Sequence, residues 1–178
     1  MSALDRLWAG WRSEYIESVT GAPGKEEGDG CVFCAILASG RPDSETHILW
    51  RHPGGDAFAI LNAFPYCSGH LMVMPTRHVA DLEVLAPAES GAVWSGVSQA
   101  VRALKSAYGP DGLNLGANLG RAGGAGIPGH FHVHVLPRWG GDTNFMTSVA
   151  DTRVLPEALS ASAAKLRAAW PVEDHPNG

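Results

Sequence analysis

The most informative segment of this 178-residue chain is GHFHVHVLP, residues 129–137, in which three histidines alternate with apolar residues. Side chains alternate between the two faces of an extended strand. The segment therefore predicts a strand over residues 131–136 with His130, His132 and His134 on one face, about 6–7 Å apart. Packing alone does not explain three histidines at a period of two. We expect them to act as nucleophile, acid, base or metal ligand near neutral pH.

Length, composition and charge limit the class of protein. A chain of 178 residues predicts a single domain over residues 1–178, and 45% hydrophobic content is typical of a globular protein. The net charge of −5 argues against nucleic acid as a partner, although backbone N–H groups can still hold a small anion. No apolar run approaches membrane-spanning length, so we expect no membrane partner. No signal peptide is visible, which predicts the cytoplasm.

Hydrophobic spacing predicts an α+β domain. We expect an N-terminal arm in about residues 1–30, helical over 3–18, and a loose tail in about residues 171–178. The predicted strands are 47–51, 57–61, 70–74, 113–119 and 131–136, and the predicted helices are 34–39, 87–108 and 155–170. Few helices separate the strands. This order predicts a mostly antiparallel sheet of about five strands, with one long helix packed on it and a C-terminal helix.

A glycine-rich loop, residues 120–129, precedes the histidine segment. Gly124, Gly126 and Gly129 match G-x-G-x-x-G, but a dinucleotide-binding loop must leave a strand and enter a helix. Here Pro128 interrupts the pattern and a strand follows, so we reject that interpretation. A flexible hairpin turn is one alternative. The direct junction with the histidines favours the other, in which glycine N–H groups approach an anion.

Cys31 and Cys34 form a C-x-x-C pair, which fits half a zinc site, a redox pair or two buried thiols. A redox role would call for a βαβ context that this sequence does not predict. A zinc site needs two more ligands, and imidazoles are common partners of thiolates. The candidate histidines are His47, His52, His70, His78 and His130. The third cysteine, Cys67, is interpreted as a thiol without a role.

Two mechanisms can use the three alternating histidines. In one, they bind a catalytic metal that activates water. In the other, one imidazole attacks a phosphorus centre and a second handles the proton of the leaving group. The residues themselves leave this choice open.

The chain resembles the histidine triad (HIT) family of nucleotide hydrolases and transferases, over roughly residues 4–150. The resemblance is carried by blocks in the family's order: LWAGWR (7–12), CVFC (31–34), LNAFPY (61–66), GHL (69–71), PTRH (75–78), NLG (118–120), GHFHVHVL (129–136) and PRWGGDTNF (137–145). The most similar branch is that of bacterial diadenosine tetraphosphate phosphorylases or hydrolases. The resemblance implies a HIT-like fold and a homodimer.

The resemblance also implies roles for single residues. His132 would attack the α-phosphorus of a nucleotide and form a nucleotidyl-histidine, and His134 would assist the leaving group. A structural zinc would be bound by Cys31, Cys34, His78 and His130. The nucleotide would be held by Val32, Phe33 and Ile36 at the base, Asn62 at the ribose, Asn118, Gly124, Ala125 and Gly126 at the phosphate, and His70 at the edge of the pocket.

The implied function is cleavage of a dinucleoside polyphosphate, such as diadenosine tetraphosphate, at its α-phosphate, with a purine nucleotide as the ligand. Gly126 departs from the family, because many members have Gln or Ser four residues before the first triad histidine. The loop is also about one residue longer than in the phosphoramidase branch. The alternatives are a nucleoside 5′-phosphoramidase, a nucleotide-binding regulatory module with little catalysis, and a metal-dependent hydrolase.

Overall fold

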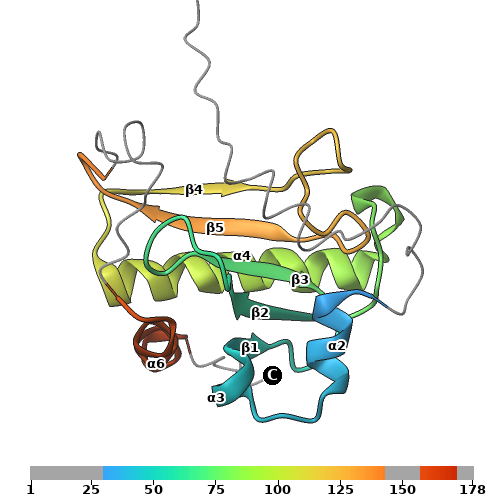
Figure 1. Cartoon of the computed structure of the whole chain (residues 1–178), viewed down its shortest axis with the longest axis horizontal. Coiled ribbons are helices and arrows are strands. Elements are labelled where there is room, and N and C mark those ends of the chain that lie inside the picture. Colours follow the sequence, from blue (N-terminus) through green and yellow to red (C-terminus); the bar gives the residue numbers. More distant parts are fainter. Residues whose placement is uncertain (1–29, 143–156, 172–178) are drawn as a thin grey trace, which may run out of the picture.

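A five-stranded antiparallel sheet organises the computed structural model of the chain, which describes residues 30–142 and 157–171 (Figure 1). The strand order is β1-β2-β3-β5-β4, and every neighbouring pair is antiparallel. The strands are β1 (Ile48–Arg51), β2 (Ala57–Leu61), β3 (Leu71–Pro75), β4 (Gly112–Gly116) and β5 (Val133–Arg138). The predicted α+β class and antiparallel sheet are confirmed.

Helices cover the sheet and its β1 edge. They are α2 (Val32–Ala38), α3 (Asp43–Thr46), the short 3₁₀ helix η1 (Leu82–Val84), α4 (Pro87–Tyr108) and α6 (Leu159–Ala169). The long helix α4 runs along one face of the sheet and contacts β2, β3 and β5, while α6 packs against α4 and β1 (Figure 1). The predicted long helix and C-terminal helix are confirmed. Within the described ranges, none of these helices has the length and apolar character needed to cross a membrane.

The sheet separates two apolar clusters because its side chains alternate between faces. On the α4 face, Leu61, Leu71 and Val73 pack with Val97 and Leu104 of the helix. The opposite cluster comprises Phe33, Ile48, Phe58, Ile60, Met72 and Met74, so it joins α2 to β1, β2 and β3. This second face carries the candidate site.

Local chemistry fixes the ends of α4 and its distance from the sheet. Pro87 occupies the first turn, and the Ala86 N–H donates to Glu89 Oε2 at 2.8 Å. Gly109 ends the helix with a φ of 54°. A Cβ at Gly96 would meet Trp50 at 2.7 Å and Val73 at 2.8 Å, so glycine is required where the helix approaches the sheet.

Some predicted boundaries shift. The predicted strand 131–136 begins at Val133 and extends to Arg138, because the Phe131 N–H donates to the Val79 carbonyl instead of to a strand. The predicted strand 113–119 is Gly112–Gly116, and the predicted helix 34–39 is Val32–Ala38. The N-terminal arm, the start of the predicted helix 155–170 and nearly all of the tail lie outside the described residues.

Candidate functional site

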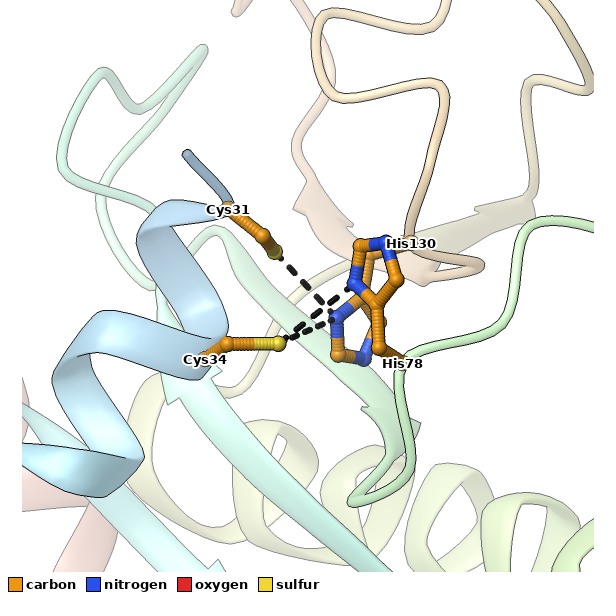
Figure 2. Close-up of side chains that lie close together, drawn as sticks. All are labelled: Cys31, Cys34, His78 and His130. Atoms are coloured by element: carbon orange, nitrogen blue, oxygen red, sulfur yellow. Dashed lines mark hydrogen bonds between the residues drawn. The ribbon is translucent and has the colours of Figure 1, made fainter. Parts of the chain in front are cut away.

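Two cysteines and two histidines from three segments meet on the α2 side of the sheet (Figure 2). Cys31 and Cys34 lie at the start of α2, His78 follows β3 and His130 precedes β5. Cys31 Sγ and Cys34 Sγ lie 3.4 and 3.8 Å from His130 Nδ1, and Cys34 Sγ lies 3.4 Å from His78 Nδ1. The four donor atoms lie within 4.8 Å of one another. Of the histidine partners considered for the C-x-x-C pair, the fold therefore brings together His78 and His130.

The donor set and its orientation fit a tetrahedral cation. Zn–S and Zn–N bonds of about 2.3 and 2.0 Å put tetrahedral S and N ligands about 3.5 Å apart. His130 Nε2–H donates to the Pro75 carbonyl at 2.9 Å, which leaves the Nδ1 lone pair facing the thiols. Burial and the neighbouring Cys31 raise the pKa of the Cys34 thiol to about 11. The Cys34 thiolate therefore needs a nearby cation to form.

His132 has one ring nitrogen fixed by the main chain. Its Nδ1 lies 2.8 Å from the His130 carbonyl oxygen. A carbonyl only accepts, so Nδ1 carries the proton and Nε2 keeps a lone pair. Burial lowers the pKa of His132, because the charged imidazolium is poorly solvated there. The arrangement therefore holds a neutral imidazole with a free nucleophilic nitrogen.

His134 is oriented by a buried partner, His70, which the family resemblance places at the edge of the nucleotide pocket. His70 is fully buried, and its Nε2 lies 2.9 Å from His134 Nδ1. The Tyr66 N–H donates to His70 Nδ1 at 3.1 Å, so the proton of neutral His70 is on Nε2. His70 therefore donates to His134, whose own proton is on Nε2. The antiparallel pairing of β3 with β5 brings the two histidines together, and chain order alone does not reveal that pairing.

A cavity beside these histidines is lined by α2, β2 and the glycine loop. Its lining residues are Val32, Phe33, Ile36, Thr46, His47, Ile60, Leu61, Asn62, Ala63, Phe64, Tyr66, Met72, Asn118, Gly124, Gly126, Ile127, His132 and His134. These include every predicted nucleotide-binding residue except His70 and Ala125. His70 is buried and contacts His134 instead of the cavity. Ala125 is also buried, and its N–H donates to the Gly120 carbonyl.

Two polar side chains that line the cavity, Asn118 and Asn62, also form hydrogen bonds within its wall. Asn118 donates from Nδ2 to the Gly124 carbonyl at 3.2 Å, which fastens the glycine loop. Asn62 Oδ1 accepts the Phe64 N–H at 3.0 Å. Thr46, His47, Phe64 and Tyr66 also line the cavity, although none of them was predicted to bind the nucleotide, because strand pairing and turns bring them there. The cavity thus has an apolar end at α2 and a polar end at His132 and His134.

Comparison with known proteins identifies similar sequences and structures. The pattern of the HIT domain matches residues 41–141, more than half of the chain. A protein of Mycobacterium tuberculosis named AP-4-A phosphorylase is 37% identical over 170 residues, which is 94% of this chain and 85% of that protein.

Two solved structures share the fold. A Zn-bound histidine triad family protein from Mycobacterium smegmatis superposes with a TM-score of 0.62 and 30% identity, over 78% of this chain and 91% of that one. A Hit-like protein from Bartonella henselae gives a TM-score of 0.65 over 82% of this chain and 99% of that one. At 21% identity, this second likeness concerns the fold alone.

Proposed function

This chain belongs to the HIT family, and from that premise we propose that it is a nucleotide-processing enzyme that cleaves a dinucleoside polyphosphate, such as diadenosine tetraphosphate, at an α-phosphate. The likeness to the AP-4-A phosphorylase over 94% of the chain supports this substrate class. The observation that carries the proposal is the hydrogen bond from His132 Nδ1–H to the His130 carbonyl, because it frees Nε2 of a neutral imidazole beside the cavity.

The proposed reaction has two steps at one phosphorus. His132 Nε2 attacks the α-phosphorus, and the bond to the bridging oxygen of the leaving polyphosphate breaks. His134 Nε2–H donates a hydrogen bond to that oxygen and stabilises the negative charge that develops on it, while His70 keeps His134 in the required tautomer. An acceptor oxygen, from water or inorganic phosphate, then attacks the phosphorus of the nucleotidyl-histidine. The bond from phosphorus to Nε2 breaks, the proton of the acceptor passes to solvent, and neutral His132 is restored.

The cavity lining supports a nucleotide in one orientation. Val32, Phe33 and Ile36 would pack on the base at the apolar end, and Asn62 would contact the ribose. At the polar end, Asn118 and the main chain of Gly124 and Gly126 would hold the phosphate beside His132.

We further propose zinc at Cys31, Cys34, His78 and His130, supported by the donor set and by the Zn-bound relative. Zinc there would stabilise the thiolates and fix His130. The His130 carbonyl in turn accepts the hydrogen bond from His132 Nδ1–H, so the metal would have a structural role. The homodimer and the cytoplasmic location stay predictions.

Product analysis tests the proposal. Wild type and His132→Gly are incubated with diadenosine tetraphosphate, with and without inorganic phosphate, and with adenosine phosphoramidate. Wild type should form ADP plus ATP if phosphate is the acceptor, or AMP plus ATP if water is. His132→Gly should lose turnover, and quenched wild type should carry a labelled nucleotidyl group. Full turnover of His132→Gly would overturn the mechanism, and faster turnover of the phosphoramidate would assign the phosphoramidase instead.

Glycine at position 126 favours a second candidate function, that of a nucleotide-binding regulatory module with little catalysis. It lines the cavity without a side-chain donor for phosphate or leaving group. Tight nucleotide binding by wild type, without turnover and without a labelled His132, would select this candidate.

A further inference from the structure

The cavity runs across the sheet over a length that suits one nucleotide. Ile60 of β2 pairs with Met72 of β3, which pairs with His134 of β5, and all three line the cavity. The lining continues to Thr46, just before β1. Neighbouring strands are about 4.8 Å apart, so the row from β1 to β5 spans about 14 Å, the scale of a nucleoside monophosphate. A dinucleoside polyphosphate with its α-phosphate beside His132 must therefore keep its second nucleoside outside this row.

Phe64 lines the cavity and is also open to solvent. Its side chain is 57% exposed, the highest fraction among the large apolar residues that the structure describes, so a ligand can reach the ring. A single exposed apolar residue is ordinary on a protein surface, and exposure alone does not assign a role. Val32 is the other exposed apolar residue of the lining, but it belongs to α2 and to the apolar end of the cavity. Phe64 instead follows β2.

The turn that carries Phe64, residues 62–70, lies beside His134. In the register of the sheet, the last residue of β2 is level with Val135, the neighbour of His134 in β5. The ring of Tyr66, two residues after Phe64, lies 6.3 Å from the ring of His134 between centroids. In the proposed reaction His134 contacts the leaving oxygen. The leaving polyphosphate therefore begins beside this turn.

Local bonds hold the turn in shape before any ligand binds. The Phe64 N–H donates to Asn62 Oδ1 at 3.0 Å, and the Tyr66 N–H donates to His70 Nδ1 at 3.1 Å. Pro65 has a fixed φ and restricts the backbone of the residue before it. An exposed aromatic ring on a preformed turn costs little to order when a ligand binds. Its flat face is suited to stacking with a nucleobase.

We propose that Phe64 is the stacking platform for the second nucleobase of the dinucleoside polyphosphate, the base that leaves with the polyphosphate. This rests on the proposed function, which places the α-phosphate at His132 and the leaving group at His134. The side chains of α2 enclose the first base, and the second base lies at the surface on Phe64. Phe64 thereby selects dinucleoside polyphosphates over nucleoside polyphosphates that end in a free phosphate. Stacking reads no hydrogen-bonding groups, so either purine serves as the second base.

Calorimetric titrations with two uncleaved analogues test this proposal. One is diadenosine tetraphosphate and the other is adenosine tetraphosphate, each with methylene groups in place of the oxygens that bridge to an α-phosphorus. The two compounds share the first nucleoside and the polyphosphate, and only the dinucleoside compound carries a second base. Beyond the statistical factor for its two identical ends, wild type should bind the dinucleoside analogue at least about 5-fold more tightly, from one base stacked on an aromatic ring.

Variants of Phe64 separate stacking from other contacts. Phe64→Ala should lose the preference, bind the adenosine tetraphosphate analogue as wild type does, and keep the wild-type melting temperature because the ring is mostly exposed. Phe64→Trp should keep the preference, whereas Phe64→Leu, which is apolar but has no flat ring, should lose most of it. Val84→Ala is the matched control, since Val84 is 56% exposed and lies outside the cavity lining, and it should keep both affinities.

Any of four results would overturn the inference. The first is a wild type that binds the dinucleoside analogue no more tightly than the other compound. The second is a Phe64→Ala variant that keeps the preference. The third is an equal loss of affinity for both analogues in that variant, which would place Phe64 against the first nucleoside. The fourth is a Phe64→Leu variant with the full preference. Failure of wild type to bind either analogue would instead contradict the proposed function, so the two failures are distinguishable.

Discussion

The ion pair between Glu89 and Arg77 gives a stability prediction with a defined dependence on pH. Glu89 Oε1 and Oε2 accept from Arg77 Nε and Nη2 at 2.7 and 2.8 Å, and Oε2 also accepts the Ala86 N–H. Hydrogen bonding to Arg77, followed by that to Ala86, lowers the pKa of Glu89 from 4.5 to about 2. Such a shift corresponds to at most about 3.4 kcal/mol. Arg77 is half exposed, so solvent screening reduces the expected value to about 2 kcal/mol.

The substitution Glu89→Gln should therefore lower the free energy of unfolding by about 2 kcal/mol at pH 7, and the melting temperature by roughly 4–8 °C. Because the folded-state pKa is depressed, this stabilisation is complete above pH 4.5 and is lost as the pH falls toward 2. The wild-type advantage should thus disappear in acid. Loss of the proposed zinc in acid would affect both variants and would cancel in the difference.

Urea unfolding of wild type and Glu89→Gln between pH 7 and the lowest pH at which both fold would measure this difference. Glu83→Gln is the matched control, because Glu83 is an exposed acid in η1 near Arg77 in sequence. We expect that control to change stability by less than about 0.5 kcal/mol. A Glu89→Gln cost as small as the control's at pH 7, or one that persists unchanged near pH 3, would refute the reasoning.

Three further predictions concern the site. His70→Asn should lower kcat about 100-fold with unchanged metal content, since His134 loses the donor that sets its tautomer; unchanged steady-state kinetics would contradict this role. Cys34→Ser should reduce bound zinc, measured by elemental analysis, and lower the melting temperature by at least about 5 °C; full zinc content would exclude Cys34 as a ligand. Because burial lowers the pKa of His132, its nucleophilic neutral form persists in mild acid; kcat/KM should therefore fall only below pH 6.5, and a decline beginning above pH 6.5 would contradict this.

Sequence pattern predicts the elements well where one periodicity persists. The helix 87–108 has the predicted ends, because proline starts it, glycine follows it and apolar side chains repeat on one face throughout. The strand of the triad is less well predicted, since alternation describes side chains but not hydrogen-bond partners. Residues 130–132 keep the alternating sequence while Phe131 bonds to Val79, outside the sheet.

The candidate site could be predicted where adjacent residues carry its chemistry, and less well where strand pairing assembles it. The triad and the C-x-x-C pair are visible as short motifs, and the family resemblance supplied His78 as their partner. His70 was assigned to the pocket edge because its contact with His134 depends on the register of β3 and β5. His47 was considered only as a metal ligand, since its position in the cavity wall cannot be derived from sequence spacing.

The short segment between the glycine loop and β5 has a consequence for local dynamics. Residues 130–132 lie outside the strand ladder. Besides isolated main-chain hydrogen bonds such as that from the Phe131 N–H to the Val79 carbonyl, two side chains hold them: His130 in the cysteine cluster and Phe131 in the core. Removing the proposed zinc would release the first of these two side chains without affecting the sheet. Amide exchange should then accelerate first at residues 130–132, while the central strands stay protected. His132, the proposed nucleophile, would lose its fixed orientation in a protein that still appears folded by circular dichroism.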